Sequence, residues 1–294
     1  MQEVSTKTIL MPRGDGSRWF GNNYAMNLYR GCPHGCIYCD SRSECYRESD
    51  FDTVKLKKDV LGILEREMAG KRKKGVVGVG SMTDHYHVFE AELEVTRRAL
   101  MLMDKYGFGA HIITKSDLCV RDIDVFKSIA RHSPVNISLT VTTNDERLCA
   151  KIERNAPNTG KRFAAMKALS DSGVLCGAVI MPILPMINDS TDNIVNLVRR
   201  TAEAGGKYVY GMFGVTLRDR QRSHFYKYLD KDFPGMKEEY IRMFGGEYVC
   251  SSPHADGLMY AVEKECRAAG LVWRMQDIIS LMQKNYCVEQ ISMF

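Results

Sequence analysis

The sequence predicts an α/β fold, and two observations support this. Short β-like runs alternate with amphipathic segments at helical spacing, and six candidate strands can be distinguished along the 294 residues. Strands separated by helices form a parallel sheet with right-handed crossovers. Six units fall short of the eight in a closed barrel. We therefore expect a partial, open (β/α)6 TIM-type barrel with a helical C-terminal extension.

The expected strands are short, apolar and rich in β-branched or aromatic residues; they cover 24–29, 76–79, 111–114, 135–141, 174–181 and 208–213. Between them, apolar residues at helical spacing mark two helices that stop at Gly70 and Gly107, a common C-terminal signal. Further helices fit the segments 122–130, 161–171 and 192–204.

The chain is expected to form one domain, because no linker-like stretch of low complexity interrupts it. We place the barrel core at about 22–215 and the C-terminal helical extension at about 216–294. An apolar fraction of 45% is enough to build a core. No run of 18 apolar residues suggests a membrane span, and the first residues lack the pattern of a signal peptide. A cytoplasmic protein without a membrane partner is the expectation.

The net charge is mildly basic, +5 from 41 Lys and Arg against 36 Asp and Glu. Such a balance is compatible with a polyanionic partner without requiring one. Arg218, Arg220 and Arg222 alternate in a run that also contains His224 and Tyr226, and this mixture of cations and aromatic rings is typical of nucleic-acid contacts.

Cysteines carry the most specific signal. Ten cysteines in a chain without an export signal favour metal or cluster binding over disulfides. Cys32, Cys36 and Cys39 directly follow the first expected strand with the spacing C-x3-C-x2-C. A short loop of this kind can place three thiolates on three irons of a [4Fe-4S] cube and leave the fourth iron open. A zinc site is the alternative, with Cys45 or His34 as the fourth ligand.

The cysteine spacing, with Tyr38 as an aromatic residue just before the last cysteine, resembles the signature of the radical S-adenosylmethionine (SAM) superfamily. The resemblance implies that SAM chelates the open iron and that Tyr38 lies near the adenine. It further implies that one electron, from a donor such as flavodoxin or ferredoxin, cleaves SAM into methionine and a 5′-deoxyadenosyl radical. That radical would remove a hydrogen atom from the substrate.

Further stretches resemble the spore photoproduct lyase-like branch of this superfamily, also described as DNA-repair-photolyase-like. They lie between about 27 and 189 and cover 27–32, 83–86, 96–98, 114–116, 121–122, 140–143, 181–185 and 188–189. The resemblance suggests DNA as a substrate and a carbon–carbon lyase activity. Spore photoproduct lyase uses a thiol as hydrogen donor, and Cys287 and Cys149 are the candidates for that role here.

Several polar residues follow the expected strands, where sites in parallel folds lie. Lys115 could pair with the SAM carboxylate or be a surface lysine. Ser138 and Thr140 share one face of the fourth strand, so their hydroxyls could bond the ribose or methionine part of SAM or be ordinary strand hydroxyls.

Two further pairs are candidates for cofactor binding. Thr83 and Asp84 could bind the SAM ammonium or a substrate group, or could cap a helix. Glu153 and Arg162 lie just beyond the fourth strand, and either could reach SAM or merely pair at the surface.

Three functional hypotheses follow from the sequence. The first is a radical SAM enzyme, with DNA photoproduct repair as its most specific form. The second is a radical enzyme that modifies a peptide or a small molecule. The third is a metal-stabilised nucleic-acid-binding module without catalysis.

Overall fold

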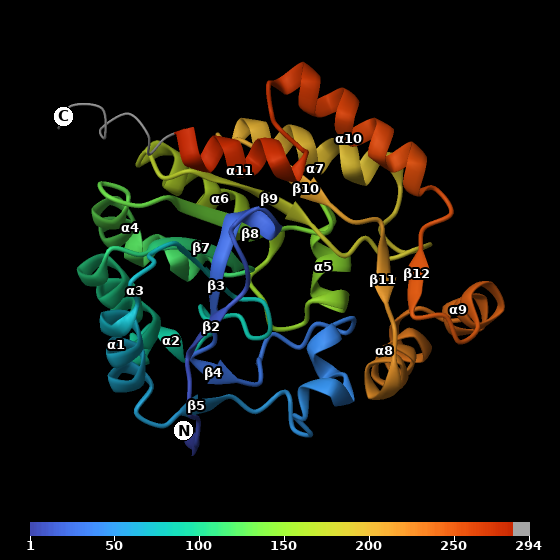
Figure 1. The fold of residues 1–294 in the computed structure, drawn as a ribbon. Helices are drawn as coiled ribbons and strands as arrows, with labels where there is room; N and C mark the ends of the chain where they lie inside the picture. Colours follow the sequence, from blue (N-terminus) through green and yellow to red (C-terminus); the bar gives the residue numbers. More distant parts are fainter. Residues whose placement is uncertain (285–294) are drawn as a thin grey trace.

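The computed structural model describes residues 1–284, and within them the expected α/β architecture is confirmed (Figure 1). Six parallel strands follow one another in chain order across one sheet: β3 (Asn22–Met26), β6 (Val76–Val79), β7 (Gly109–Thr114), β8 (Val135–Thr140), β9 (Cys176–Ile180) and β10 (Val209–Gly211). A seventh strand, β2 (Leu10–Pro12), joins antiparallel beside β3. Because β2 and β10 lie at opposite edges of this sheet, the barrel is open.

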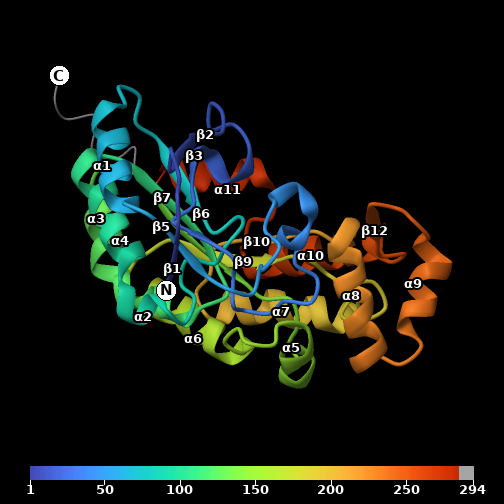
Figure 2. The same cartoon turned by 90° about the horizontal axis from the view of Figure 1, so that it is seen from below.

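Within the described residues, seven α-helices lie between the strands of this sheet: α1 (Val60–Gly70), α2 (Glu90–Leu93), α3 (Val95–Tyr106), α4 (Ile123–Ile129), α5 (Glu146–Ile152), α6 (Thr159–Asp171) and α7 (Thr191–Glu203). Five of them, α1, α3, α4, α6 and α7, cover the outer side of the curved sheet, whereas Ile152 of α5 packs in the apolar cluster of the cysteine loop (Figures 1 and 2). In α7 the buried residues are Ile194, Leu197, Val198 and Thr201. This spacing of three and four residues gives a single apolar stripe that packs on the sheet.

The two faces of the sheet differ in polarity. In β8, Ile137 and Leu139 belong to the large apolar core shared with the outer helices. The alternate residues Asn136 and Ser138 instead hydrogen-bond to the hydroxyl of Tyr208 on the inner side. Because side chains alternate along a strand, the same strand supplies both an apolar outer core and a polar interior.

The interior is filled at the end where the strands begin. The short helix η1 (Trp19–Gly21) inserts Phe20, which stacks on the ring of His111 at 4.3 Å between centroids. Ile278 and Met282 of α11 (Met275–Lys284) pack in the same inner cluster. The strand ends opposite this plug remain available for a site.

The C-terminal extension differs from expectation in one respect. It contains α8 (Asp219–Asp232), α9 (Met236–Phe244), α10 (Ala255–Ala269) and α11, but also an antiparallel pair of strands, β11 (Gly214–Thr216) and β12 (Val249–Ser251). These strands have three residues each, too few for a periodic pattern to be recognised in the sequence. We propose that core and extension form one domain, because Leu258 and Val262 of α10 lie in the main apolar core.

The first expected strand, 24–29, is divided in the structure. Its beginning is β3, whereas Tyr29–Arg30 forms β4, which pairs in a second sheet with β5 (Lys55–Lys57), itself paired with β1 (Gln2–Val4). Short 3₁₀ helices complete the fold: η2 (Asp40–Arg42), η3 (Glu44–Tyr46) and η4 (Asp117–Asp122). Among residues 1–284, no helix combines the length and apolar character needed to cross a membrane.

Packing of α3 on the sheet generates a stability prediction. Leu100 is 0% exposed and its neighbour Met101 is 54% exposed. We expect Leu100→Ala to lower the free energy of unfolding by about 2–5 kcal/mol, because it leaves a cavity in the core. The matched control Met101→Ala should change it by less than about 0.5 kcal/mol. Chemical denaturation followed by circular dichroism measures both, and equal effects would contradict the assigned faces of α3.

Candidate active site

The three clustered cysteines lie on the loop between β4 and η2, close to the carboxyl ends of the parallel strands. Cys32 and Cys36 are 9% and 7% exposed, and Cys39 is half-buried. The loop begins at Gly31, whose φ is +75°. A Cβ atom at Gly31 would lie 2.2 Å from the carbonyl oxygen of Thr53, so the chain can enter the loop only through glycine.

Backbone hydrogen bonds fasten the cysteine loop to the segment that follows α5. The N–H of Ile37 donates to the carbonyl of Ile152 at 3.0 Å, and the N–H of Asn155 donates to the carbonyl of His34 at 2.9 Å. The side-chain amide of Asn155 also donates to the carbonyl of Pro33 at 2.9 Å. The loop is thus positioned by main-chain contacts as well as by its own turn residues.

Burial makes the thiols reluctant to ionise without a metal. It raises the pKa of Cys32 to about 12 and also raises those of Cys36 and Cys39. The Cys39 thiolate further raises the pKa of Cys32, and the Cys32 and Cys39 thiolates further raise the pKa of Cys36. The Lys115 ammonium, by contrast, acts to lower the pKa values of Cys36 and Cys39. A cationic iron centre would supply the missing compensation, since metal-bound thiols are deprotonated.

The donor set fits an iron–sulfur cube better than a zinc ion. A structural zinc centre takes four protein ligands, whereas a [4Fe-4S] cube takes three thiolates, each on a different iron, and leaves the fourth iron open. Cys45, considered as a fourth zinc ligand, is exposed.

A buried ion pair lies beneath the cysteine loop. Glu153 and Arg162 have fully buried side chains, and Nη1 of Arg162 is 2.5 Å from Oε2 of Glu153. The hydroxyl of Tyr38 donates to Glu153, as does that of Thr142 at 3.1 Å. The alternative of a surface pair is therefore wrong for these two residues.

The ion pair fixes the protonation of its neighbours. Burial raises the pKa of Glu153, but the Arg162 and Lys115 cations outweigh it and lower that pKa to about 2. Burial and the Glu153 carboxylate raise the pKa of Tyr38 well above its ordinary value. Glu153 is therefore an anion and Tyr38 a neutral donor near pH 7, which holds the Tyr38 ring in one position.

Asp84 follows β6 and Lys115 follows β7, and both residues lie beside the cysteine loop. The ammonium of Lys115 lies 5.6 Å from the centre of the Tyr38 ring. Burial lowers the pKa of Lys115, but the Cys36 thiolate and Glu153 carboxylate outweigh burial and raise it, so Lys115 is a cation. This half-buried cation is not the surface lysine considered as an alternative.

The Asp84 carboxylate is held by several donors. It accepts hydrogen bonds from the Thr114 hydroxyl at 2.7 Å, from the Lys115 N–H at 2.7 Å and from the Tyr86 N–H at 3.0 Å. The ring of His34 lies 3.5 Å away. Burial raises the pKa of Asp84, and His34 with these donors more than reverses that effect, so the pKa is lowered. The structure places Asp84 outside any helix cap; it ties the β6 loop to the end of β7.

The remaining candidates lie at different depths. Thr83 is buried and lines a cavity of about 250 Å³ beside the cysteine loop. The carbonyl of Thr140 accepts a hydrogen bond from Arg162 at 3.0 Å. Ser138 lies deeper in the interior, where its hydroxyl contacts Nε2 of His111 at 3.0 Å and the hydroxyl of Tyr208 at 2.6 Å.

Of the two candidate hydrogen donors, Cys149 lies within the described residues and Cys287 lies outside them. Cys149 is 1% exposed, and its sulfur lies 3.6 Å from both Glu153 and Arg162.

Two contributors to the site were missed from the sequence. Thr142 belongs to the 140–143 stretch that resembles the lyase-like branch, so the resemblance could have indicated it as a site residue. Asn155 has no such signal, because the carbonyl that it contacts lies 122 residues earlier in the chain.

The basic run in α8 is engaged within the protein. Arg218 pairs with Asp40 at 2.9 Å, and Arg220 donates to the carbonyl of Glu48 at 3.1 Å. Arg222 donates to the carbonyl of Gly245 at 2.7 Å. The contacts of Arg218 and Arg220 reach the segment that follows the cysteines, and that of Arg222 reaches the end of α9, so all three guanidinium groups are engaged within the protein.

The buried ion pair generates a pH-dependent prediction. We expect Glu153→Gln to lower the free energy of unfolding near pH 7 by about 3–5 kcal/mol, because Arg162 loses its counter-ion in a buried site. The folded pKa of about 2 lies below the ordinary 4.5, so the Glu153 contribution is complete above pH 4.5 and is lost as the pH falls towards 2. The difference between wild type and variant should therefore narrow on acidification.

Urea denaturation between pH 3 and pH 7 measures this difference. Glu239→Gln serves as the control, because Glu239 pairs with Arg242 at the surface with 46% of its side chain exposed. If the difference in free energy of unfolding between wild type and Glu153→Gln stays constant from pH 7 to pH 3, the assigned role of the Glu153 charge is contradicted.

Comparison with known proteins matches this chain to one family and to several solved structures. The family model of the radical SAM superfamily matches residues 26–198. An uncharacterised protein of Mycobacterium bovis is 28% identical over 228 residues, which are 75% of this chain and 67% of that protein. An uncharacterised protein of Methanocaldococcus jannaschii is 29% identical over 216 residues, covering 73% of this chain and 78% of that protein.

Among solved structures, spore photoproduct lyase complexed with dinucleoside spore photoproduct superposes with a TM-score of 0.66 at 13% identity, over 87% of this chain and 77% of that one. The radical SAM methyltransferase TsrM from Kitasatospora setae gives 0.56 at 9% identity, over 88% and 61%. At such identities the structures show a shared fold. The family match covers more than half of the chain and includes all three loop cysteines, so this protein belongs to the radical SAM superfamily, whose cofactors are a [4Fe-4S] cluster and SAM.

Proposed function

We propose that this protein is an enzyme that cleaves SAM reductively and uses the resulting radical to abstract hydrogen from a substrate. Cys32, Cys36 and Cys39 hold the cluster. When bound, the reduced cluster and SAM supply methionine and a 5′-deoxyadenosyl radical, with the electron coming from a carrier such as flavodoxin or ferredoxin. The observation that carries the proposal is the single loop that holds three cysteines, two buried and one half-buried, beside the Lys115 cation.

The chain's own residues bind and orient the cofactors. Lys115 supplies a cation for the SAM carboxylate, because it remains protonated beside the loop. Glu153 and Arg162 position Tyr38, whose ring lies under the Lys115 ammonium. Thr83 and Thr140 offer hydroxyls to SAM at strand ends, with Ser138 one layer below.

Water exclusion is the second task of the site. The cysteine loop is covered by α8, because Gln221 donates to the carbonyl of Tyr38 at 3.0 Å and Phe225 packs in the apolar cluster that includes Ile37. A site closed in this way protects a reactive radical from side reactions with solvent.

Single cysteine substitutions test the proposal. We expect Cys32→Ala, Cys36→Ala or Cys39→Ala to abolish formation of 5′-deoxyadenosine, because three protein thiolates are needed to hold the cluster. The measurement is anaerobic reconstitution with iron and sulfide, then dithionite, SAM and chromatography of the products.

Cys45→Ala is the matched control, since Cys45 lies close in sequence but is exposed. It should retain the iron content and SAM cleavage of the wild type. Failure of the wild-type protein to cleave SAM despite a bound, reducible cluster would overturn the proposal, as would uptake of zinc alone.

DNA photoproduct repair is the most specific form of this function. Its support is the fold shared with spore photoproduct lyase and the mildly basic net charge. In this form Cys149 and Cys287 are the candidate thiol donors of hydrogen to the product radical. Arg218, Arg220 and Arg222 already make contacts within the protein, so their run is not part of the support for DNA as the substrate.

Ultraviolet-damaged DNA provides the corresponding test. If DNA is the substrate, we expect duplex binding that weakens steeply with added salt, because phosphate contacts release counterions, together with loss of photoproduct during SAM turnover. Cys149→Ala should keep SAM cleavage but diminish repaired product if Cys149 is the donor. Absence of duplex binding even at low salt would exclude DNA and leave a peptide or small molecule as the substrate.

A further inference from the structure

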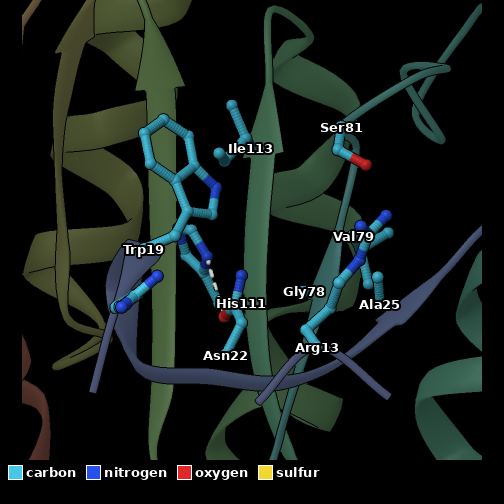
Figure 3. Close-up of a pocket in the computed structure, with 10 residues that line it drawn as sticks. Arg13, Trp19, Asn22, Ala25, Gly78, Val79, Ser81, His111 and Ile113 are labelled. Carbon is cyan, nitrogen blue, oxygen red and sulfur yellow. Dashed lines mark hydrogen bonds between the residues drawn. The ribbon is translucent and has the colours of Figure 1, made fainter. Parts of the chain in front are cut away.

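A cavity of about 320 Å³ lies on the inner side of the sheet, apart from the cysteine loop. Its walls come from the N-terminal segment before β3 and from β3, β6 and β7 (Figure 3). The volume falls at the lower end of the range for small-molecule sites. Ser81 at one side of the cavity lies two residues before Thr83, so the cavity extends towards the strand ends where SAM is expected.

The cavity is cationic. Arg13 and Arg18 line it, and no Asp or Glu side chain is part of the lining. Both arginines are exposed, and within residues 1–284 neither takes part in an ion pair. The side chain and the N–H of Ser17, the latter at 2.9 Å, lower the pKa of Asp15 by hydrogen bonding to its carboxylate, and Arg18 makes only a minor contribution. Two guanidinium groups without carboxylate partners favour a phosphate or carboxylate ligand.

An aromatic wall lies beside these cations. Trp19 is 38% exposed and lines the cavity, and its ring is held edge-on by Phe20 at 5.2 Å and by Tyr210 at 5.7 Å between centroids. Trp19 and Phe20 have φ values of 28° and 53°, which are unfavourable for such residues. The buried stacking of Phe20 on His111 holds this turn in place, so the Trp19 ring is presented in a fixed position.

A fixed polar group completes the wall. Oδ1 of Asn22 lies 3.2 Å from Nδ1 of His111, as the dashed line in Figure 3 marks. Burial lowers the pKa of His111 to about 3, so its ring is neutral and orients the Asn22 amide. Gly78 leaves room for this amide, because a Cβ atom there would lie 2.2 Å from Nδ2 of Asn22. The amide can therefore meet the polar edge of a ring placed in the cavity.

We propose that this cavity is a subsite for an anionic aromatic substrate, a planar ring that carries a phosphate or carboxylate group. Arg13 and Arg18 bind the anionic group, Trp19 contacts the ring, and Asn22 bonds its polar edge. That the bound ligand is a substrate rests on the proposed function, whereas its binding requires no turnover. A nucleotide and an aromatic acid share this chemistry, and the test separates them.

Calorimetry with two matched ligand pairs tests the proposal on the reconstituted, anaerobic protein. The pairs are thymidine 5′-monophosphate with thymidine, and benzoate with benzyl alcohol; thymidine avoids the adenine recognised in SAM. We expect the anion of at least one pair to bind at least about ten-fold more tightly than its neutral partner, because each arginine contributes a charge-assisted hydrogen bond. The pair that binds identifies the source of the anion.

Arg13→Gln and Arg18→Gln should each weaken anion binding about ten-fold. Arg131→Gln, which removes the same charge from an exposed arginine after α4, should leave it unchanged. In a Trp273→Phe background Trp19 is the sole tryptophan, so binding should also change its fluorescence. Neutral and anionic ligands of equal affinity, an effect of Arg131→Gln equal to that of the cavity variants, or an unchanged Trp19 signal would each overturn the proposal.

SAM cleavage assayed on the same preparation separates this inference from the proposed function. Cleavage without anion binding would overturn the subsite alone. Anion binding without cleavage would overturn the proposed function and leave the binding site intact.

Discussion

The buried pair of Glu153 and Arg162 is the constraint on which the site depends. Neither charge can be solvated where it lies, so each requires the other and the hydrogen bonds around them. One of those bonds comes from Tyr38 in the cysteine loop. The Glu153 carboxylate therefore joins the cysteine loop, the segment after α5 and helix α6, and it adds to the main-chain contacts that position the loop.

The charges around the loop suit an iron–sulfur cofactor. Buried thiols resist ionisation, and the half-buried Lys115 cation offsets part of that resistance at Cys36 and Cys39. A cationic iron centre would complete the compensation, which couples cluster binding to the electrostatics of the site. The Asp84 carboxylate adds a negative charge that raises the pKa of Cys32.

The two faces of the sheet have different roles: the outer face stabilises the fold, and the inner face carries polar side chains. Outer helices and alternate strand residues form the large apolar core that stabilises the fold. The inner face instead carries His111, Ser138 and Tyr208 in a hydrogen-bonded chain, with Phe20 and α11 closing one end. Cavities with polar walls can persist there because the apolar core lies on the other face. The strained turn at Trp19 and Phe20 fits this division, since one ring packs inside and the other lines a cavity.

The sequence by itself determined the order of the strands, the positions of the main helices and the cysteine loop, because alternating strands, helical stripes and the C-x3-C-x2-C spacing are local patterns. It also marked Lys115 and Asp84 at strand ends. Tertiary structure alone decided that Glu153 and Arg162 form a buried pair, that Asn155 fastens the loop, that Arg218, Arg220 and Arg222 are engaged internally, and that three-residue strands enter the C-terminal extension. These features depend on contacts between residues far apart in the chain, and no local pattern encodes which distant partner a side chain will meet.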